Sequence, residues 1–444
     1  MTHTLPSSRL CHGPLLLLLV TMFCCLVLPT NANAGKRNTG EERLSPRQYA
    51  AIVDARNFLD KGEPDKAIKT LQPQAKTKRP PRIILSHLGW ALIETGDKPG
   101  ALDVYAVAVK LYPDDPEVRR NLGVLLLELG RYSQAADALE KAYTLQPEDK
   151  RDPALLLQAA YALTETKNFK RALGLAERAL KAATEPPLPW FNLAVHCCLR
   201  LHRQDKALHF ARNGTRLHPR EEAAWTLYAR LLARTGDPLG GAAALETALA
   251  LRAGDGRERT AALSKETATL YALGHAHAEA ARHLDDAPDP GSQLSAADLY
   301  RRNGRNREAL AALNRFEAAS RKDTTDDRAA HLRAAVLGGR ILLDMNRTED
   351  GISRLLKAAD KAAPNASKTE QRLRGTALLM AGEARWMERK WRDAAAIFTK
   401  LATVPGFGST GTSLAAGMRA LLREAAMAHD APATQPAIPS PSES

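Results

Sequence analysis

Three residues that could bind a metal ion are spaced four apart: His275, Glu279 and His283, with His277 between them. On one continuous helix, residues four apart share a face, and a histidine paired with a carboxylate can hold zinc. Gly274, however, predicts a turn between two helices, which would remove His275 from that face. Two ligands do not make a metal centre, so we expect neither a metal site nor a cofactor.

Other chemical signatures of an enzyme are missing from the sequence. It contains no phosphate-binding loop, nucleophile elbow, zinc-protease helix or dinucleotide fingerprint. The adjacent Cys197 and Cys198 would point to different sides of a helix and are poorly placed to bridge each other. We interpret them as small apolar residues that pack in a helix, not as a redox pair. The sequence therefore predicts a protein that is not an enzyme.

A strict spacing of 34 residues governs the first part of the chain. It recurs in glycines, in alanines and in large side chains: Gly62, Gly96 and Gly130; Ala67, Ala101 and Ala135; Leu71, Tyr105 and Leu139. Such a period indicates one supersecondary unit that is stacked repeatedly. We predict a pair of helices, in which glycine forms the turn, alanine allows close helix approach and the large residue fills the space between units.

This frame extends through most of the chain. Residues 48–252 predict an N-terminal array of six units, and residues 257–428 predict a more divergent array that ends in a capping helix over 413–428. In its last two units we expect the turns at Asn346 and Lys390. Residues 257–287 do not follow the 34-residue spacing clearly, and they are either a true repeat or a hinge. The tail, 429–444, is rich in proline and serine, and we expect it to be disordered.

The repeated residues resemble a known family. Leu88 and Gly89, followed by Gly96, Ala101 and Tyr105, look like a tetratricopeptide repeat, and the next unit keeps the same pattern. The resemblance weakens after residue 250. It implies an all-α fold, a right-handed α-solenoid superhelix of about nine stacked antiparallel helix pairs, with a concave groove lined by the first helix of each unit.

The N-terminus resembles a targeting segment. An apolar run from Pro14 to Leu28 follows Arg9 and precedes the small-residue motif Ala32-Asn33-Ala34. We interpret residues 1–34 as a signal peptide cleaved near Ala34, with a linker over 35–47, because the run is short for a membrane-spanning helix. The expected location is periplasmic or secreted. The alternative is an uncleaved N-terminal membrane anchor, the only case in which we expect membrane contact.

The charge balance favours an acidic partner. The chain has 63 Lys and Arg residues against 50 Asp and Glu residues, a formal net charge of +13. A positive surface attracts acidic proteins, anionic glycans or membranes. Nucleic acid is a poor candidate for an exported protein, and the sequence lacks a basic run interleaved with aromatic residues.

Candidate binding residues lie on the first helix of successive units. The spacing places ten side chains on or near the inner face: Arg56, Trp90, Arg120, Asn121, Tyr161, Asn192, Arg230, Arg234, Arg301 and Arg340. The family resemblance implies that asparagines bind the backbone of a bound peptide while basic neighbours bind its carboxylates, which suits the forked arginine side chain. Alternatively, these arginines only solubilise the surface, and Glu94, Glu128 and Glu165 fall on the same stripe.

We therefore expect a non-enzymatic scaffold or adaptor of the cell envelope that binds an extended, acidic segment of another protein in the groove. Assembly of an envelope complex, secretion and polysaccharide export are plausible settings by analogy with similar exported repeats. The alternative is a glycan-binding accessory protein of polysaccharide synthesis or export. It would need aromatic stacking platforms, for which Trp90, Tyr161, Trp190 and Trp386 are the candidates. The sequence leaves the oligomeric state open.

Overall fold

The computed structural model describes residues 44–252, 254, 257–285, 287, 289–320, 325–360 and 366–430. Over these residues the regular structure is entirely helical, with α2 to α22 and one short 3₁₀ helix, η1. Consecutive helices pack as adjacent pairs, and α22 follows the tenth pair. The all-α fold of stacked helix pairs predicted from the 34-residue period is confirmed.

The chain divides into two compact units, the first ending at Leu122 and the second beginning at Gly123. Helix α6 contains this boundary. The helices of the first unit, with α6, are α2 (Pro46–Asp60), α3 (Pro64–Ala75), α4 (Arg82–Glu94), α5 (Lys98–Leu111) and α6 (Pro116–Glu128).

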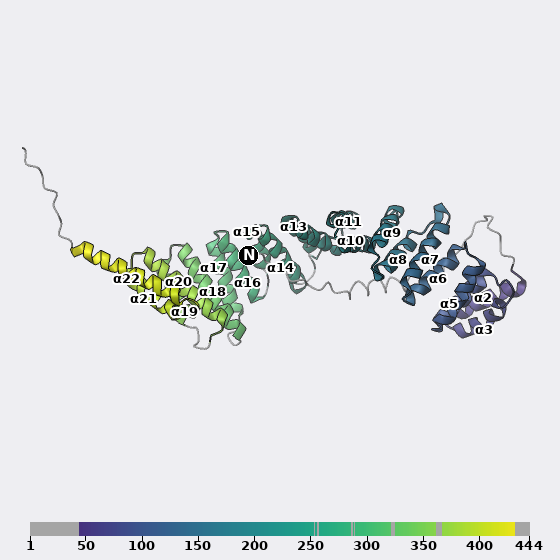
Figure 1. Ribbon diagram of the computed structural model, residues 1–444, viewed down its shortest axis with the longest axis horizontal. Coiled ribbons are helices and arrows are strands. Elements are labelled where there is room, and N and C mark those ends of the chain that lie inside the picture. The colour runs from purple at the N-terminus through teal and green to yellow at the C-terminus, as the bar shows by residue number, and fades with distance from the viewer. Residues whose placement is uncertain are drawn as a thin grey trace, which may run out of the picture. The chain divides into compact units, whose positions relative to one another are not determined.

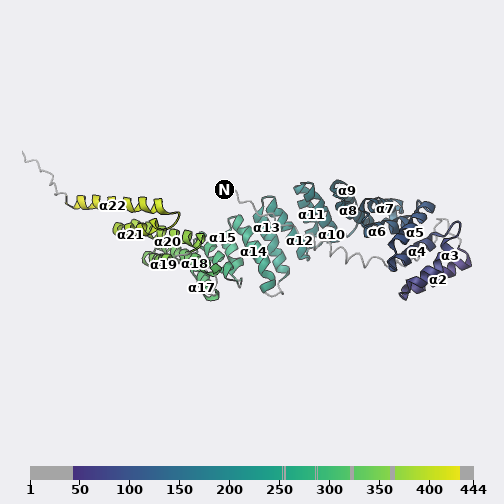
Figure 2. The same ribbon diagram turned by 60° about the horizontal axis from the view of Figure 1, so that its bottom comes forward.

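The second unit continues with helix pairs that follow one another in chain order (Figures 1 and 2). Its helices are α7 (Tyr132–Leu145), η1 (Glu148–Lys150), α8 (Pro153–Glu165), α9 (Phe169–Ala182), α10 (Leu188–Arg200), α11 (Gln204–Leu217), α12 (Glu222–Arg234), α13 (Pro238–Leu251), α14 (Arg257–Leu273), α15 (His277–Asp285), α16 (Pro290–Arg302), α17 (Asn306–Ala319), α18 (Thr325–Asp344), α19 (Thr348–Asp360), α20 (Lys368–Met387), α21 (Trp391–Ala402) and α22 (Gly408–Asp430).

Each helix pair turns on one residue with left-handed backbone geometry. Five of these residues are glycines and five are not: Gly62, Gly96, Gly130, Gly236 and Gly304; Lys167, His202, His275, Asn346 and Arg389. The expected glycine turns and the turn at Asn346 are therefore confirmed. The last turn residue is Arg389, one position before the expected Lys390, because α21 has Lys390 as its N-cap.

Within a pair, a small residue on the first helix faces a large one on the second. A β-carbon added to Gly89 would lie 2.5 Å from the ring of Tyr105, and one added to Gly382 would lie 2.3 Å from the ring of Phe398. Both aromatic rings are almost fully buried. The close approach of the two helices therefore requires glycine, as the repeated pattern predicts.

The apolar core is a series of clusters along the chain. In the second unit, one cluster includes Ala229 and Leu245, a second includes Tyr300 and Phe316, and a third includes Phe398. A solenoid is stabilised in this way by contacts between neighbouring units.

The uncertain stretch 257–287 contains a helix pair, α14 and α15, which packs against α13 on one side and α16 on the other. The expected capping helix over 413–428 lies within α22, which packs on α21 and buries Ala415 and Met418. The predicted signal peptide (1–34), the linker up to residue 43 and the tail from residue 431 lie outside the described residues. None of the helices described has both the length and the apolar content of a membrane span.

Candidate binding face on the first helices

Three polar side chains on consecutive first helices of the second unit have buried acceptor atoms without hydrogen-bond partners. These atoms are Gln158 Oε1 on α8, Asn192 Oδ1 on α10 and Thr226 Oγ1 on α12. Asn192 and Thr226 are each the fifth residue of their helix, and Gln158 is the sixth of its own. All three side chains remain partly exposed. We refer to them as the acceptor row.

The acceptor row is costly in the isolated protein. A buried acceptor that lacks a donor costs about 1–3 kcal/mol, and native structures contain few of them. Backbone N–H groups of a bound chain are suitable donors, since hydroxyl and amide oxygens both accept hydrogen bonds. Asn192 was among the residues selected from the sequence. Gln158 and Thr226 were missed, although Thr226 lies one 34-residue step after Asn192.

Arg230 forms an ion pair with Glu266 of the next first helix, α14. Its Nε and one terminal nitrogen donate to the two carboxylate oxygens at 2.8 and 3.0 Å. The hydrogen bond to Glu266 raises the pKa of the Arg230 guanidinium, and partial burial opposes this shift. Arg230 is therefore already engaged within the protein, whereas the sequence suggested a guanidinium that binds a ligand carboxylate.

Arg301 is likewise engaged. Its terminal nitrogens lie 3.4 Å from Asp298 and 3.6 Å from Asp344, and its side chain is only 15% exposed. Arg234 on α12 and Arg340 on α18 are exposed instead, and neither forms an ion pair with a described residue. Among the arginines predicted in the second unit, these two have their charges available.

The aromatic candidates occupy different environments. Tyr161 on α8 is partly buried, and burial together with the nearby Glu165 carboxylate raises the pKa of its hydroxyl. Trp190 is 7% exposed and cannot present a ring to a sugar, whereas Trp386 is 46% exposed. A continuous aromatic platform of the kind that glycan binding would require is not present on the described first helices α8 and α10.

The remaining four candidates belong to the first unit. Arg56 on α2 and Arg120 on α6 are exposed, and Asn121 is partly buried. Trp90 on α4 is partly buried and donates from Nε1 to Glu94 at 3.0 Å. Trp90 and Glu94 thus pair along their own helix.

The histidine cluster does not form the stripe considered from the sequence. His275 adopts the left-handed turn conformation, and α15 begins only at His277. His283 lies 3.1 Å from the Glu246 carboxylate and stacks on the ring of Tyr271. Among the described residues, no group of three His, Cys, Asp or Glu side chains could hold a metal ion.

Both cysteines of α10 are buried free thiols. Burial raises the pKa of the Cys197 thiol to about 12 and that of the Cys198 thiol to about 11. Nucleophilic and redox reactions need the thiolate, which these environments disfavour. The two cysteines therefore act as small core residues, as we inferred from the sequence.

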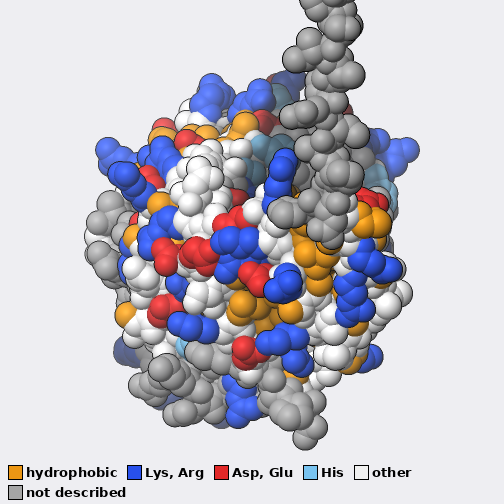
Figure 3. All heavy atoms as spheres, turned by 90° about the vertical axis from the view of Figure 1, so that its left-hand side faces the viewer, with side chains coloured by type: hydrophobic (Ala, Val, Ile, Leu, Met, Phe, Trp, Pro, Cys, Tyr) orange, Lys and Arg blue, Asp and Glu red, His pale blue; other side chains and the backbone are white. Residues whose placement is uncertain are grey.

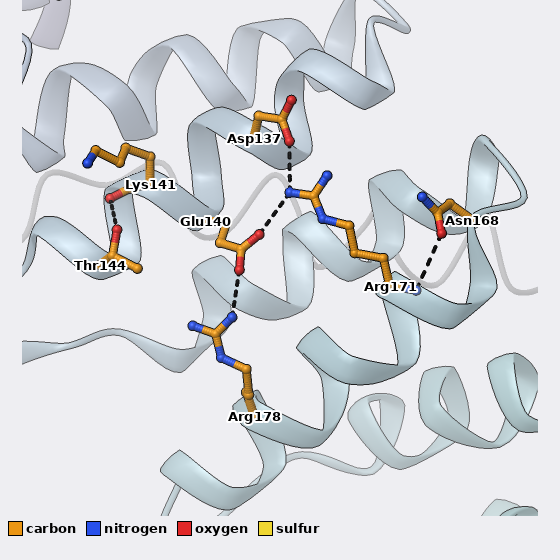
Figure 4. Close-up of polar contacts among 7 residues, drawn as sticks. All are labelled: Asp137, Glu140, Lys141, Thr144, Asn168, Arg171 and Arg178. Carbon is orange, nitrogen blue, oxygen red and sulfur yellow. Dashed lines mark hydrogen bonds and ion pairs between the residues drawn. The ribbon is translucent and has the colours of Figure 1, made fainter.

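Charged residues on the second helices connect neighbouring repeats. Arg171 and Arg178 of α9 reach back to α7, where Arg171 contacts Asp137 and Glu140, and Arg178 contacts Glu140 at 2.6 Å (Figure 4). Burial opposes ionisation of Glu140, but hydrogen bonds from the two arginines outweigh it and hold the pKa of its carboxyl below the usual range. Lys206 of α11 likewise reaches back to α9, where its Nζ donates to Glu177 at 3.1 Å.

Basic residues are also mixed with acidic ones elsewhere. Figure 3 views the end of the second unit that carries α22, where Lys and Arg side chains are interleaved with Asp and Glu. The net positive charge of the chain is therefore not gathered into one basic field on this face.

Comparisons with known proteins agree with the fold. Residues 54–116, 87–153 and 120–187 match the tetratricopeptide repeat family. A curated relative, the peroxisomal targeting signal receptor of Candida albicans, is 27% identical over 141 residues, which cover 31% of this chain and 24% of the relative. The match thus spans about a quarter of that receptor.

The solved structures that this chain resembles are distant in sequence. YrrB, a TPR protein with an unusual peptide-binding site, is 18% identical, with a TM-score of 0.34 and coverage of 47% of this chain and 97% of YrrB. The C-terminal part of a TPR repeat-containing protein from Cytophaga hutchinsonii is 15% identical, with a TM-score of 0.40 and coverage of 62% and 98%. Residues 54–187 are therefore similar to tetratricopeptide repeats, and the described helices outside this range continue the same architecture of stacked helix pairs.

Proposed function

We propose that this repeat protein is a non-enzymatic adaptor that binds an extended segment of a partner protein along α8, α10 and α12. The acceptor row of Gln158, Asn192 and Thr226 carries the proposal. Rotation of these partly exposed side chains would turn the oxygens toward the surface, where backbone N–H groups of a bound chain would donate to them and relieve the cost of leaving them unpaired. Side chains on different repeats would then each contribute a modest part of the affinity.

The charges next to the acceptor row support a partner with few carboxylates at this face. Arg230 is neutralised by Glu266, while Arg234, one turn further along α12, is exposed and has no ion-pair partner among the described residues. A single acidic side chain in the partner segment would suffice to pair with Arg234. Recognition would therefore depend on the backbone acceptors first and on charge second.

The proposed setting is the cell envelope, with the protein exported by its N-terminal segment. The apolar run from Pro14 to Leu28 and the Ala32-Asn33-Ala34 motif support export, since their order is that of a cleaved signal. The curated relative is a receptor for a targeting signal, and segment recognition would be a shared property. Fractionation of native cells with an antibody against the chain tests this location, and recovery in the cytoplasm at full length would refute it.

The binding proposal is tested by site-specific photo-crosslinking. A photoreactive phenylalanine analogue at position 234 is expected to capture one protein partner in native extracts, and Thr226→Val in the same chain is expected to reduce that capture several-fold. The matched control carries the same analogue at Lys170, an exposed residue of α9. Equal capture at both positions, or capture that ignores Thr226→Val, would exclude the first-helix face as the binding site.

A further inference from the structure

A second concave site lies between the second helices of two neighbouring repeats. It is a pocket of about 370 Å³ between α9, α11 and the loop 183–187 that joins α9 to α10. Its apolar lining includes Leu180, Phe191, Phe210 and Leu217. Phe191 is buried, Leu180 and Phe210 are partly exposed, and Leu217 is 43% exposed. The pocket thus leaves apolar surface of large side chains in contact with water.

One wall of the pocket is fixed in position by the loop. His218 Nε2 donates to the carbonyl oxygen of Pro186 at 2.8 Å and packs edge-to-face on Phe191, with 6.3 Å between ring centroids. Gly214 of α11 allows a close approach, because a β-carbon there would lie 3.3 Å from Leu188. These contacts connect α11 with the loop and with α10, so this wall of the pocket is formed before any partner arrives.

Two exposed cations line this pocket. Lys181 of α9 and Arg216 of α11 line it, both are exposed, and neither forms an ion pair with a described residue. The one carboxylate in the lining, Glu177, is paired with Lys206 at 3.1 Å. An incoming carboxylate would therefore meet two available positive charges and little repulsion from Glu177.

The two helices that frame the pocket are strongly basic. Between them, α9 and α11 carry seven Lys or Arg residues and only two carboxylates, Glu177 and Asp205. Arg171, Arg178 and Lys206 are paired with carboxylates, and two of the four remaining cations, Lys181 and Arg216, line the pocket. An acidic partner complements this surface.

We propose that this pocket is a second docking site, which takes an acidic peptide segment with one large apolar side chain. The apolar side chain, leucine or phenylalanine in kind, would fill the space lined by Leu180, Phe210 and Leu217. Flanking carboxylates would pair with Lys181 and Arg216. A lipid headgroup or a nucleic-acid phosphate would pair with the two cations but would leave the apolar lining exposed to water. A peptide can contact both the cations and the apolar lining, so it fits the pocket best.

This site is independent of the acceptor row, because its cations belong to second helices and the acceptors belong to first helices. One protein could therefore hold two segments at once, or two parts of the same partner. Linking two modest sites in this way raises the overall affinity without any new contact.

The test uses fluorescence anisotropy with the full chain and a short, labelled peptide of Asp, Glu and Ser with one central Phe. The same peptide with Ala in place of Phe is expected to bind about tenfold more weakly, because the apolar contact is lost. The double variant Lys181→Glu/Arg216→Glu should weaken the Phe peptide by at least about tenfold. Leu217→Ala should weaken it several-fold.

A matched control makes the same charge change on the same two helices. Lys170→Glu/Arg212→Glu alters α9 and α11 outside the pocket lining and should leave binding within about twofold. Asn192→Leu, which changes the acceptor row, should also leave it unchanged. Thermal unfolding of each variant confirms that the fold is intact.

Several outcomes would overturn the proposal. Equal binding of the Phe and Ala peptides would mean that charge alone acts and that the pocket is empty. Equal losses in the two double variants would mean that the position of the cations is irrelevant. Preference for phosphatidylserine vesicles over the peptide, lost in Lys181→Glu/Arg216→Glu, would assign the surface to a membrane. Loss with Asn192→Leu alone would place the peptide on the first-helix face, and no saturable binding would remove the site.

Discussion

Replacing Asn192 by leucine should make the free protein more stable while it weakens partner binding. Asn192 Oδ1 is buried and unpaired, so the native state bears a cost of about 1–3 kcal/mol that the solvated amide of the unfolded chain does not bear. Leucine removes this cost and also favours the helix over asparagine by a few tenths of a kcal/mol. We therefore expect a gain of about 1–3 kcal/mol in the stability of α10 and its neighbours.

Asn168 provides the matched comparison. Its side-chain oxygen accepts a hydrogen bond from the backbone N–H of Arg171 and caps α9. Asn168→Leu removes a cap and should cost about 1 kcal/mol. The same substitution, asparagine to leucine, is thus expected to raise stability at position 192 and to lower it at position 168.

Hydrogen exchange of the α10 and α11 amides is the suitable assay, because repeats open locally and a single global transition is not guaranteed. Asn192→Leu should slow exchange in α10 about tenfold for each 1.4 kcal/mol gained and raise the denaturation midpoint. The photo-crosslink from position 234 should fall in the same variant. If Asn192→Leu instead speeds exchange as Asn168→Leu does, then Asn192 is satisfied in the free protein and the acceptor row is not a binding feature.

Two further predictions concern the C-terminal repeats. Gly411→Ala would place a β-carbon 2.3 Å from the backbone nitrogen of Ala402, so α22 must shift away from α21 at a cost of about 1–3 kcal/mol. In Gly417→Ala the new β-carbon meets no atom within 4 Å, and the variant should stabilise α22 by up to about 1 kcal/mol. Equal stability of the two variants in urea unfolding would contradict this prediction. The pKa of Glu349 is lowered from 4.5 to about 2, chiefly by the hydrogen bond from Arg385. As the pH falls, the carboxyl of Glu349 takes up a proton in the unfolded chain before it does so in the folded protein. The stability that this carboxylate contributes is therefore complete above pH 4.5 and declines toward pH 2. Glu349→Gln should lack this pH-dependent contribution, and parallel acid-unfolding curves for the two proteins would refute the prediction.

The repeat architecture could be predicted because it depends on residue types at fixed spacing. Glycines at 34-residue steps mark left-handed turns, and small residues facing large ones mark helix crossings. The turns at Lys167 and Arg389 have the same left-handed backbone geometry without a glycine. A non-glycine residue pays roughly 1–2 kcal/mol to adopt this conformation, and packing of the flanking helices compensates for it. That compensation is a tertiary effect, which local sequence does not reveal.

The candidate site was harder to predict, because the state of a charged side chain depends on residues one repeat away. Arg230 is paired with Glu266, which lies 36 residues further on, in the part of the chain whose register is blurred in sequence. Arginine and asparagine were predicted at the site because these residue types are often used in recognition. Thr226 could not be predicted in this way, because its proposed role depends on a buried oxygen without a donor and not on its residue type.

Net charge alone does not locate the binding surface of this protein. The formal charge of +13 suggests a basic face, yet Arg171, Arg178, Arg230 and Arg301 all pair with carboxylates of the same chain. Each of these pairs is partly screened by water and contributes little free energy, but it removes a cation from the set that can attract a partner. Among the cations that remain available, Lys181 and Arg216 lie beside exposed apolar side chains of the pocket, and Arg234 lies on the same helix as the unpaired Thr226 oxygen. Positive charge can then attract an acidic partner, while the apolar and hydrogen-bonding groups determine where it binds. Replacing one of these three cations should therefore lower the affinity for the partner far more than the same charge change elsewhere on the surface.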